Sequence, residues 1–148
     1  MVEIFFPTER PPADDDILSL WQMMVSPDHP RWDRPDNPAY ADKRPDQVLE
    51  LFRATLLPRA THQACWARVE GQIVGRATLR RCVEEGQEHC GEIGFTVRTV
   101  YRGRGIGHRL VQTIVERARE MGLERLQCSC FDSNVAAIAL LKKAGFHL

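Results

Sequence analysis

An apolar segment, a glycine-rich turn and an amphipathic helix follow one another in this chain, and their order constrains the fold most. The turn, VYRGRGIGHRL at 100–110, contains three glycines and three arginines. Apolar residues then recur at three- and four-residue steps, which predicts a helix over 106–121. Gly122 stands where a helix-ending glycine belongs. The preceding segment, EIGFTV at 92–97, has the β-branched and aromatic residues of a strand. The glycines therefore join a strand to a helix N-terminus.

Glycine and positive charge at a helix start are typical of an anion-binding site. A helix N-terminus presents unpaired N–H groups and a positive dipole end, and glycine lets backbone approach a phosphate closely. A Walker loop would end in Gly-Lys-Ser/Thr, whereas this turn reads Gly107-His108-Arg109. A dinucleotide fingerprint needs a further glycine where His108 stands. A nucleic-acid-binding segment would lie in disordered basic sequence. A glycine-rich turn without a ligand remains the alternative.

The rest of the chain alternates strand and helix patterns. The order of strand, two helices, three strands, helix, strand and helix predicts one α+β domain over 1–148, built on a mixed sheet. The segment at 27–38, rich in Pro and Asp, is predicted to be a loop. The remaining predicted elements are a strand at 2–6, helices at 15–25 and 46–57, hairpin strands at 63–69 and 73–81, a strand at 124–131, and a helix at 135–144.

Charge is distributed unevenly along a chain whose net charge is zero. Residues 1–50 carry five Lys/Arg and eleven Asp/Glu, whereas residues 98–148 carry nine and four, which suits two differently charged ligands. The five cysteines, an odd number, are typical of reduced thiols, and we expect neither a disulfide framework nor a metal site. Because the sequence has neither a membrane-length apolar run nor a signal-peptide pattern, it predicts a cytoplasmic protein without membrane or nucleic-acid partners.

Two stretches together resemble the GNAT superfamily of acyl-CoA-dependent N-acyltransferases. They are EIGFTV…YRGRGIGHRLV and LQCSCFDSNVAAIALLKKAGF. The second contains the pattern N-x-x-A-x-x-L-x-x-K-x-G-F, from Asn134 to Phe146. The resemblance is specific over residues 91–146 and weak before them. It implies a central, mostly antiparallel sheet flanked by helices.

The resemblance also implies an acetyl-CoA site around the glycine turn. The pyrophosphate of coenzyme A would bind backbone amides at 103–108, and the pantetheine arm and acetyl carbonyl would lie along the preceding strand. Asn134 would contact the cofactor, cap the last helix, or do both. The implied cofactor-binding residues are Phe95, Val97, Arg102, Gly103, Arg104, Gly105, Ile106, Gly107, His108 and Asn134.

The activity that the resemblance implies is transfer of an acetyl group from acetyl-CoA to a primary amine of a small molecule or peptide. In direct attack through a tetrahedral intermediate, the amine must lose a proton and the oxyanion needs a hydrogen-bond donor. A backbone N–H near Phe95 is the expected donor. Glu92, where several members of the family place a glutamate, is the predicted general base, and His89 is the next candidate. A solvent-exposed structural carboxylate is the alternative interpretation of Glu92.

Leu141 departs from the family pattern, because many members have a tyrosine there that protonates the leaving thiolate. Water, another hydroxyl or a thiol would replace it, or the thiolate would leave unaided, since its pKa is near 8.5. A non-catalytic acyl-CoA-binding or regulatory domain is the alternative function that this departure favours.

The family usually continues through two more strands, whereas only three residues follow Gly145 here. We therefore expect the last strands to be lacking and the strand at 124–131 to be an open edge, which is prone to pairing with another chain. A homodimer through this edge is the resulting expectation. Its apolar face is predicted to consist of Leu126, Cys128 and Cys130.

Overall fold

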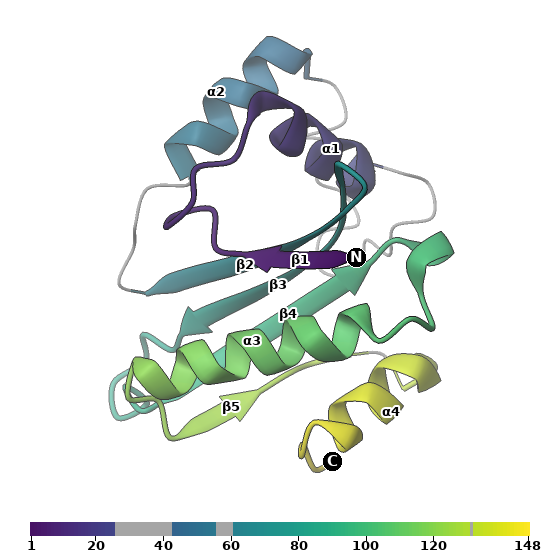
Figure 1. Ribbon diagram of the computed structural model, residues 1–148. Coiled ribbons are helices and arrows are strands. Elements are labelled where there is room, and N and C mark those ends of the chain that lie inside the picture. The colour runs from purple at the N-terminus through teal and green to yellow at the C-terminus, as the bar shows by residue number, and fades with distance from the viewer. Residues whose placement is uncertain (26–42, 56–60, 131) are drawn as a thin grey trace.

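The computed structural model describes residues 1–25, 43–55, 61–130 and 132–148. Within them, five strands form one sheet in the order β1-β2-β3-β4-β5 (Figure 1). β1 to β4 pair antiparallel, and β5 pairs parallel with β4. The strands are β1 (Val2–Phe5), β2 (His62–Val69), β3 (Gln72–Arg81), β4 (Cys90–Val97) and β5 (Arg125–Gln127). The predicted α+β class with a mainly antiparallel sheet is confirmed.

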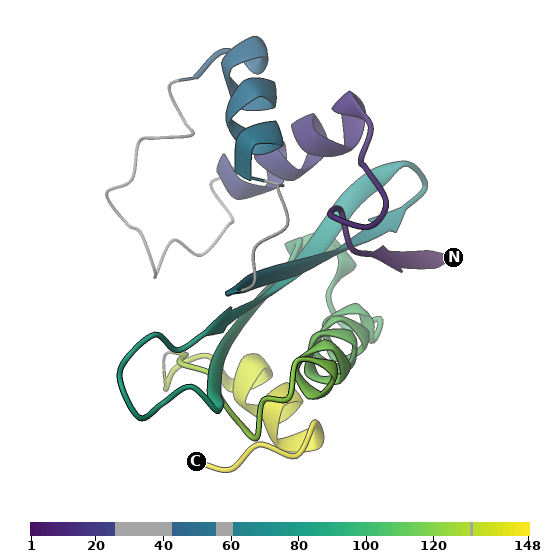
Figure 2. The ribbon, with the colours of Figure 1, turned by 90° about the vertical axis from the view of Figure 1, so that its left-hand side faces the viewer.

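Helices cover both faces of this sheet (Figures 1 and 2). One face carries α1 (Asp14–Val25) and α2 (Pro45–Thr55), and the other carries α3 (Ile106–Glu120) and α4 (Val135–Lys143). A short 3-10 turn, η1 (Thr99–Tyr101), leads from β4 towards α3. None of the helices in the described ranges is long and apolar enough to cross a bilayer.

Each face of the sheet has its own apolar core, because successive strand residues point to opposite faces. On β2, Cys65 packs in the core under α3, whereas its neighbour Trp66 packs in the core under α1 and α2. Leu110 and Ile114 of α3 are fully buried in the first core, and Ile17 of α1 is fully buried in the second. Burying side chains of this size stabilises the fold by about 1.5–3 kcal/mol each.

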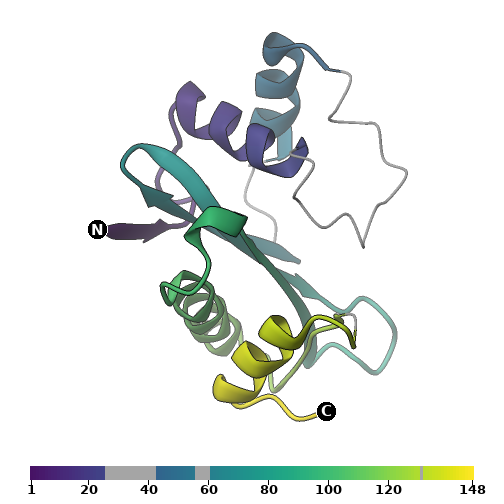
Figure 3. The same ribbon diagram turned by 90° about the vertical axis from the view of Figure 1, so that its right-hand side faces the viewer.

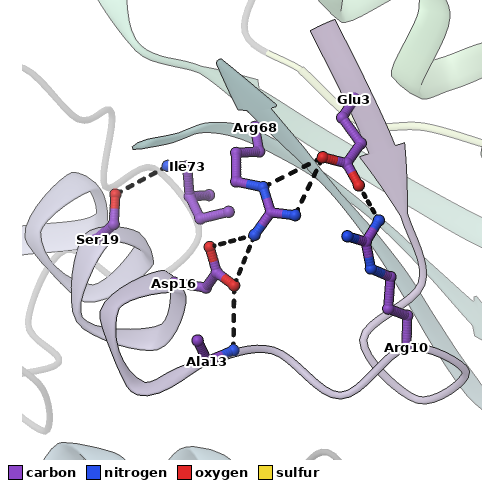
Figure 4. Close-up of polar contacts among 7 residues, drawn as sticks. All are labelled: Glu3, Arg10, Ala13, Asp16, Ser19, Arg68 and Ile73. Atoms are coloured by element: carbon purple, nitrogen blue, oxygen red, sulfur yellow. Dashed lines mark hydrogen bonds and ion pairs between the residues drawn. The ribbon is translucent and has the colours of Figure 1, made fainter. Parts of the chain in front are cut away.

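An ionic network attaches α1 to the sheet (Figure 4). Arg68 on β2 donates two hydrogen bonds to the carboxylate of Asp16, at 2.8 and 2.9 Å, and others to Glu3 on β1. Asp16 is buried and also accepts from the amide of Ala13 at 3.1 Å. Since an unpaired buried charge is costly, this network fixes the start of α1 over β1 and β2.

The predicted order of elements is confirmed, with ends shifted by one or two residues except at one strand. The prediction of a strand over 124–131 is wrong beyond Gln127. Residues 128–130 separate from β4 and form no strand pairing with it. The predicted loop at 27–38 and the end of the helix at 46–57 lie outside the described residues.

Candidate functional site

A cleft opens where β4 and β5 part. The parallel pairing runs only from Cys90–Arg125 to Glu92–Gln127, after which β4 continues to Val97 paired with β3 but not with β5. The space between them is about 350 Å³. Its lining comes from β4, the glycine turn, the start of α3, the segment after β5, and α4: Gly94, Phe95, Thr96, Val97, Tyr101, Arg102, Gly103, Gly105, Ile106, Gly107, His108, Cys128, Ser129, Cys130, Asn134, Ala136, Ala137, Leu140 and Lys143.

Two glycines give the turn its shape. Gly103 and Gly105 have φ angles of +77° and +79°, in the left-handed region that glycine adopts without strain. A Cβ on either would meet no atom within 4 Å. The backbone conformation, and not the lack of space, therefore requires glycine at both positions. The same open space leaves the turn accessible from the cleft.

Two arginines of the turn contact neighbouring residues and stabilise its conformation. Arg102 donates from Nε to the carbonyl oxygen of Val97 at 3.2 Å, which closes the turn back onto the end of β4. Arg104 lies over the ring of Tyr101, with its guanidinium carbon 5.1 Å from the ring centroid. Both side chains remain exposed, so their charge adds to the positive end of α3.

The polar groups at the start of α3 fit an anion. Among the described residues, the amides of 103–108 donate to no backbone carbonyl, and the first bond of this helix is Arg109 N–H to Gly105 O at 3.1 Å. The Nδ1 atom of His108 is buried and likewise has no described hydrogen-bond partner. Because buried polar groups are almost always paired, the Nδ1 atom of His108 beside the open amides of a helix N-terminus indicates a binding site.

The start of α4 forms the opposite wall of the cleft. The side chain of Asn134 accepts a hydrogen bond from the amide of Ala137 at 3.2 Å and so caps this helix. A Cβ on Gly107 would lie 2.8 Å from Cδ1 of Leu140. Glycine at this position therefore lets α3 approach α4 closely and keeps the cleft narrow.

The structure brings nine of the ten predicted cofactor residues together in this cleft. Arg104 is the exception, because its side chain lies on Tyr101 and does not line the cleft. Asn134 is a helix cap that also lines the cleft, so both interpretations of this residue are compatible with its position. Cofactor binding by these residues stays a prediction.

Glu92 lies outside the cleft lining. A Cβ on its neighbour Gly91 would contact leucines of the core under α3, so strand alternation places Glu92 on the opposite face. Its Oε2 is 3.0 Å from Nη2 of Arg80, the residue across from it on β3. His89 is exposed in the turn before β4, and its carbonyl accepts from the amides of Glu124 and Arg125.

The position of Leu141 agrees with the departure noted in the sequence. Leu141 is buried, packs in the core under α3, and lines a separate groove beside β5 instead of the cleft. The leucine at this position does not line the space where the strands part. The cleft therefore receives no proton donor from residue 141.

Sequence reasoning missed the residues that follow β5. Cys128, Ser129 and Cys130 line the cleft, although their alternating pattern had indicated a strand. Burial raises the pKa of the Cys128 thiol to about 11, with smaller contributions from Cys130 and Glu92. Since only the thiolate is a good nucleophile, Cys128 is poorly suited to form a covalent acyl intermediate. Tyr101 and Lys143 were missed as site residues as well, although Lys143 is the lysine of the pattern from Asn134 to Phe146.

Comparison with protein families identifies the Acetyltransferase (GNAT) family, whose model matches residues 17–146. An uncharacterized N-acetyltransferase of Bacillus subtilis is 40% identical over 54 residues, which is 36% of this chain and 34% of that protein. An L-methionine sulfoximine/L-methionine sulfone acetyltransferase of Pseudomonas aeruginosa is 36% identical over 64 residues, 43% and 37% of the two chains. The chain thus matches little more than a third of the length of these relatives.

Solved structures with the same fold include an acetyltransferase of the GNAT family from Streptococcus pneumoniae. It has a TM-score of 0.74 and 18% identity, over 100% of this chain and 85% of the other. A putative acetyltransferase from Salmonella typhimurium, solved with its cofactor acetyl-CoA, has a TM-score of 0.70 and 18% identity, over 99% and 79% of the chains. At these identities, the likeness concerns the fold.

Proposed function

The chain belongs to the GNAT family of acetyltransferases, and we propose that it transfers an acetyl group from acetyl-CoA to a primary amine. One observation carries the proposal: β4 separates from β5 next to the glycine turn and the open N-terminus of α3. This arrangement combines an anion-binding end with a narrow cleft along the edge of β4 that faces away from β3, where β5 no longer pairs with it. A phosphate-bearing thioester with an extended arm has this combination of features.

The glycine turn would hold the pyrophosphate of coenzyme A. The amides of 103–108 are free of backbone partners among the described residues, and Arg102 supplies charge beside them. The pantetheine arm would lie along β4 beyond Glu92, where the β5 side of the strand has no described strand partner. The amide groups of the arm are suited to hydrogen bonds with such an open strand edge.

The chemistry requires a base for the amine and a donor for the oxyanion. We assign the base to Glu92 and the donor to a backbone N–H of β4 near Phe95. With Leu141 buried outside the cleft, the thiolate leaves unaided or takes its proton from water, which its pKa near 8.5 permits. The attack is direct, because the raised pKa of Cys128 disfavours a cysteine acyl-enzyme.

The amine is a small-molecule or peptide amine, and the named relatives give an order in which to test acceptors. One relative's name specifies L-methionine sulfoximine and L-methionine sulfone, and that of an Escherichia coli protein specifies L-amino acids. The Escherichia coli protein is 25% identical over 99 residues, 61% of its length. The α-amino group of an amino acid or an analogue is therefore the first acceptor to test.

Two measurements test the proposal. Calorimetry with acetyl-CoA reports binding, and release of the free thiol of coenzyme A with a panel of amines reports transfer. Binding together with amine-dependent thiol release supports the acetyltransferase. Binding without release for any amine favours the second candidate, a non-catalytic acyl-CoA-binding domain, which the position of Leu141 supports. Absence of acetyl-CoA binding rejects both.

A further inference from the structure

A single arginine lies where β4 leaves the sheet. Arg98 follows the last residue of β4 and precedes η1. The ribbon in Figure 3 shows η1, in green, leading from the end of β4 towards α3. Its side chain is half-buried, although a surface turn would leave an arginine exposed. The question is what holds a guanidinium group at this position.

Arg98 makes hydrogen bonds to two different elements. Its backbone N–H donates to Val74 O on β3 at 2.7 Å, and its Nε donates to Ile73 O, also on β3, at 2.9 Å. Its Nη2 donates to Ser19 O on α1 at 2.8 Å. A guanidinium group is suited to such a role because its donors have a fixed planar geometry and stay charged.

The two acceptors on β3 lie at an irregularity of the sheet. Arg68 pairs with Ile73 and Ala67 pairs with Gly75, so Val74 has no partner on β2 and forms a β-bulge. A bulge leaves backbone groups without ladder partners, and here α1 and Arg98 satisfy them. The hydroxyl of buried Ser19 accepts from Ile73 N–H at 2.8 Å (Figure 4), while Arg98 binds the carbonyl of the same residue.

We infer that Arg98 is a positioning residue that joins the cofactor turn and α1 to one point of β3. The preceding residue, Val97, has its carbonyl bound by Arg102 of the turn. Hydrogen bonds at both ends of the Val97–Arg98 peptide therefore connect α1 to the glycine turn. Because α1 covers the face of the sheet on which Glu92 lies, Arg98 couples the two faces of the site. This functional part of the inference rests on the proposed function.

The coupling has a physical basis in the groups that Arg98 satisfies. Without its side chain, Ile73 O and Ser19 O lose a charged donor. The backbone hydrogen bond from Arg98 to Val74 O remains, but the chain that leaves β4 is no longer attached to α1 through this residue. The turn would then sample several conformations, and binding of coenzyme A would have to select one of them. Loss of Arg98 should therefore weaken cofactor binding although the side chain does not line the cleft.

A matched control exists at the other end of β3. Arg81 is also half-buried and also binds two backbone carbonyls, those of Glu88 and Met121, at 3.0 and 2.9 Å. Met121 directly follows α3, whose 15 residues place it roughly 20 Å from the glycine turn. Arg81→Met and Arg98→Met remove the same kind of bonds, so they should reduce the melting temperature similarly.

The experiment compares these two variants and Arg98→Lys with the unaltered protein, by hydrogen exchange without ligand and by calorimetry with coenzyme A. Arg98→Met should accelerate amide exchange in both 99–108 and α1 and raise the Kd about tenfold. Arg81→Met should leave both the exchange in these segments and the Kd unchanged. Arg98→Lys keeps the charge and one donor nitrogen, so it should show smaller changes in exchange and Kd than Arg98→Met. If Arg98→Met raises KM for acetyl-CoA more than it lowers kcat, the role is positioning.

Two results would overturn the inference: exchange in 99–108 and α1 that is the same in Arg98→Met and Arg81→Met, or a Kd that both variants change equally. If Arg98→Met does not fold, Arg98→Lys carries the comparison. The exchange measurement needs no ligand. An unaltered protein that fails to bind coenzyme A would therefore reject the proposed function, while the exchange data would still decide the role of Arg98 in joining the turn to α1.

Discussion

Replacing Gly105 by glutamate tests whether the glycine turn holds a phosphate. Gly105 is the N-cap of α3 with a φ of +79°, and a side chain in this left-handed region costs about 1–2 kcal/mol. In a domain of this size, that cost lowers the melting temperature by roughly 2–8 °C. A new carboxylate about 4 Å from a phosphate adds roughly 4 kcal/mol of repulsion per charge at an effective dielectric constant of 20.

That repulsion corresponds to about a thousandfold rise in Kd for acetyl-CoA, measured by calorimetry. Gly122→Glu is the control, because Gly122 has a φ of +77° and equally open space, at the other end of the same helix. Both variants should lose similar stability, and only Gly105→Glu should lose binding. Gly105→Gln, without the charge, should bind more tightly than Gly105→Glu. A Kd for Gly105→Glu within twofold of the unaltered protein would show that the turn holds no phosphate.

Three further predictions follow from other parts of the structure. Glu92→Gln should lower kcat by roughly 10²–10⁴ and leave the Kd for acetyl-CoA unchanged. Arg80→Gln removes the same ion pair and should leave kcat unchanged. Equal losses of kcat in the two variants would exclude Glu92 as the base. Burial raises the pKa of Cys65 from 9.0 to about 12, so only the unfolded thiol ionises above pH 9. This thiol alone should lower the free energy of unfolding by about 1.4 kcal/mol per pH unit between pH 9 and its folded pKa. Cys128, whose pKa is also raised, adds to the decrease. Chemical denaturation should therefore show a smaller slope in Cys65→Ala. β5 is an edge strand of the described sheet, and an open edge can pair with another chain. We therefore predict a dimer in sedimentation at micromolar concentration and its loss in Gln127→Lys. A monomeric unaltered protein contradicts this prediction.

The glycine turn and α3 were predictable because each has a local cause. Positive φ angles at Gly103 and Gly105 require glycine, and the apolar steps of α3 match one helix face. Both signals lie within neighbouring residues of the chain. Part of the candidate cleft follows from them, since the turn and the helix start supply seven of its 19 lining residues.

The segment after β5 was not predictable in the same way. Leu126, Cys128 and Cys130 alternate with polar residues, which is the pattern of a strand with one buried face. Their side chains do pack against the core under α3, so the pattern reported burial correctly. The pattern carries no information about strand pairing, which depends on the neighbouring strand as well. It therefore could not indicate that the segment after β5 separates from β4.

Arg98 was invisible to sequence reasoning for a related reason. Its role depends on Ser19, which lies 79 residues away, and on a bulge at Val74 of β3. The neighbouring Gly75 is a sequence signal for a bulge but does not indicate which donors satisfy it. An arginine next to an arginine-rich turn is read as one more surface charge. Only the fold shows that its donors are used inside the protein.

The sheet itself limits where the proposed reaction takes place. The cleft beside the turn lies on the side of α3 and α4, whereas Glu92 lies on the face that carries α1 and α2. A continuous sheet would keep the thioester from the base, so the two must meet where β5 no longer pairs with β4, beyond Glu92. Gly94, the next residue on the same face as Glu92, lines that opening. Two strand residues span roughly 6.6 Å, which exceeds direct hydrogen-bond reach and matches a path through one water molecule. If Glu92 is the base, as proposed, this spacing predicts that it acts on the amine through a water, with β4 setting the distance.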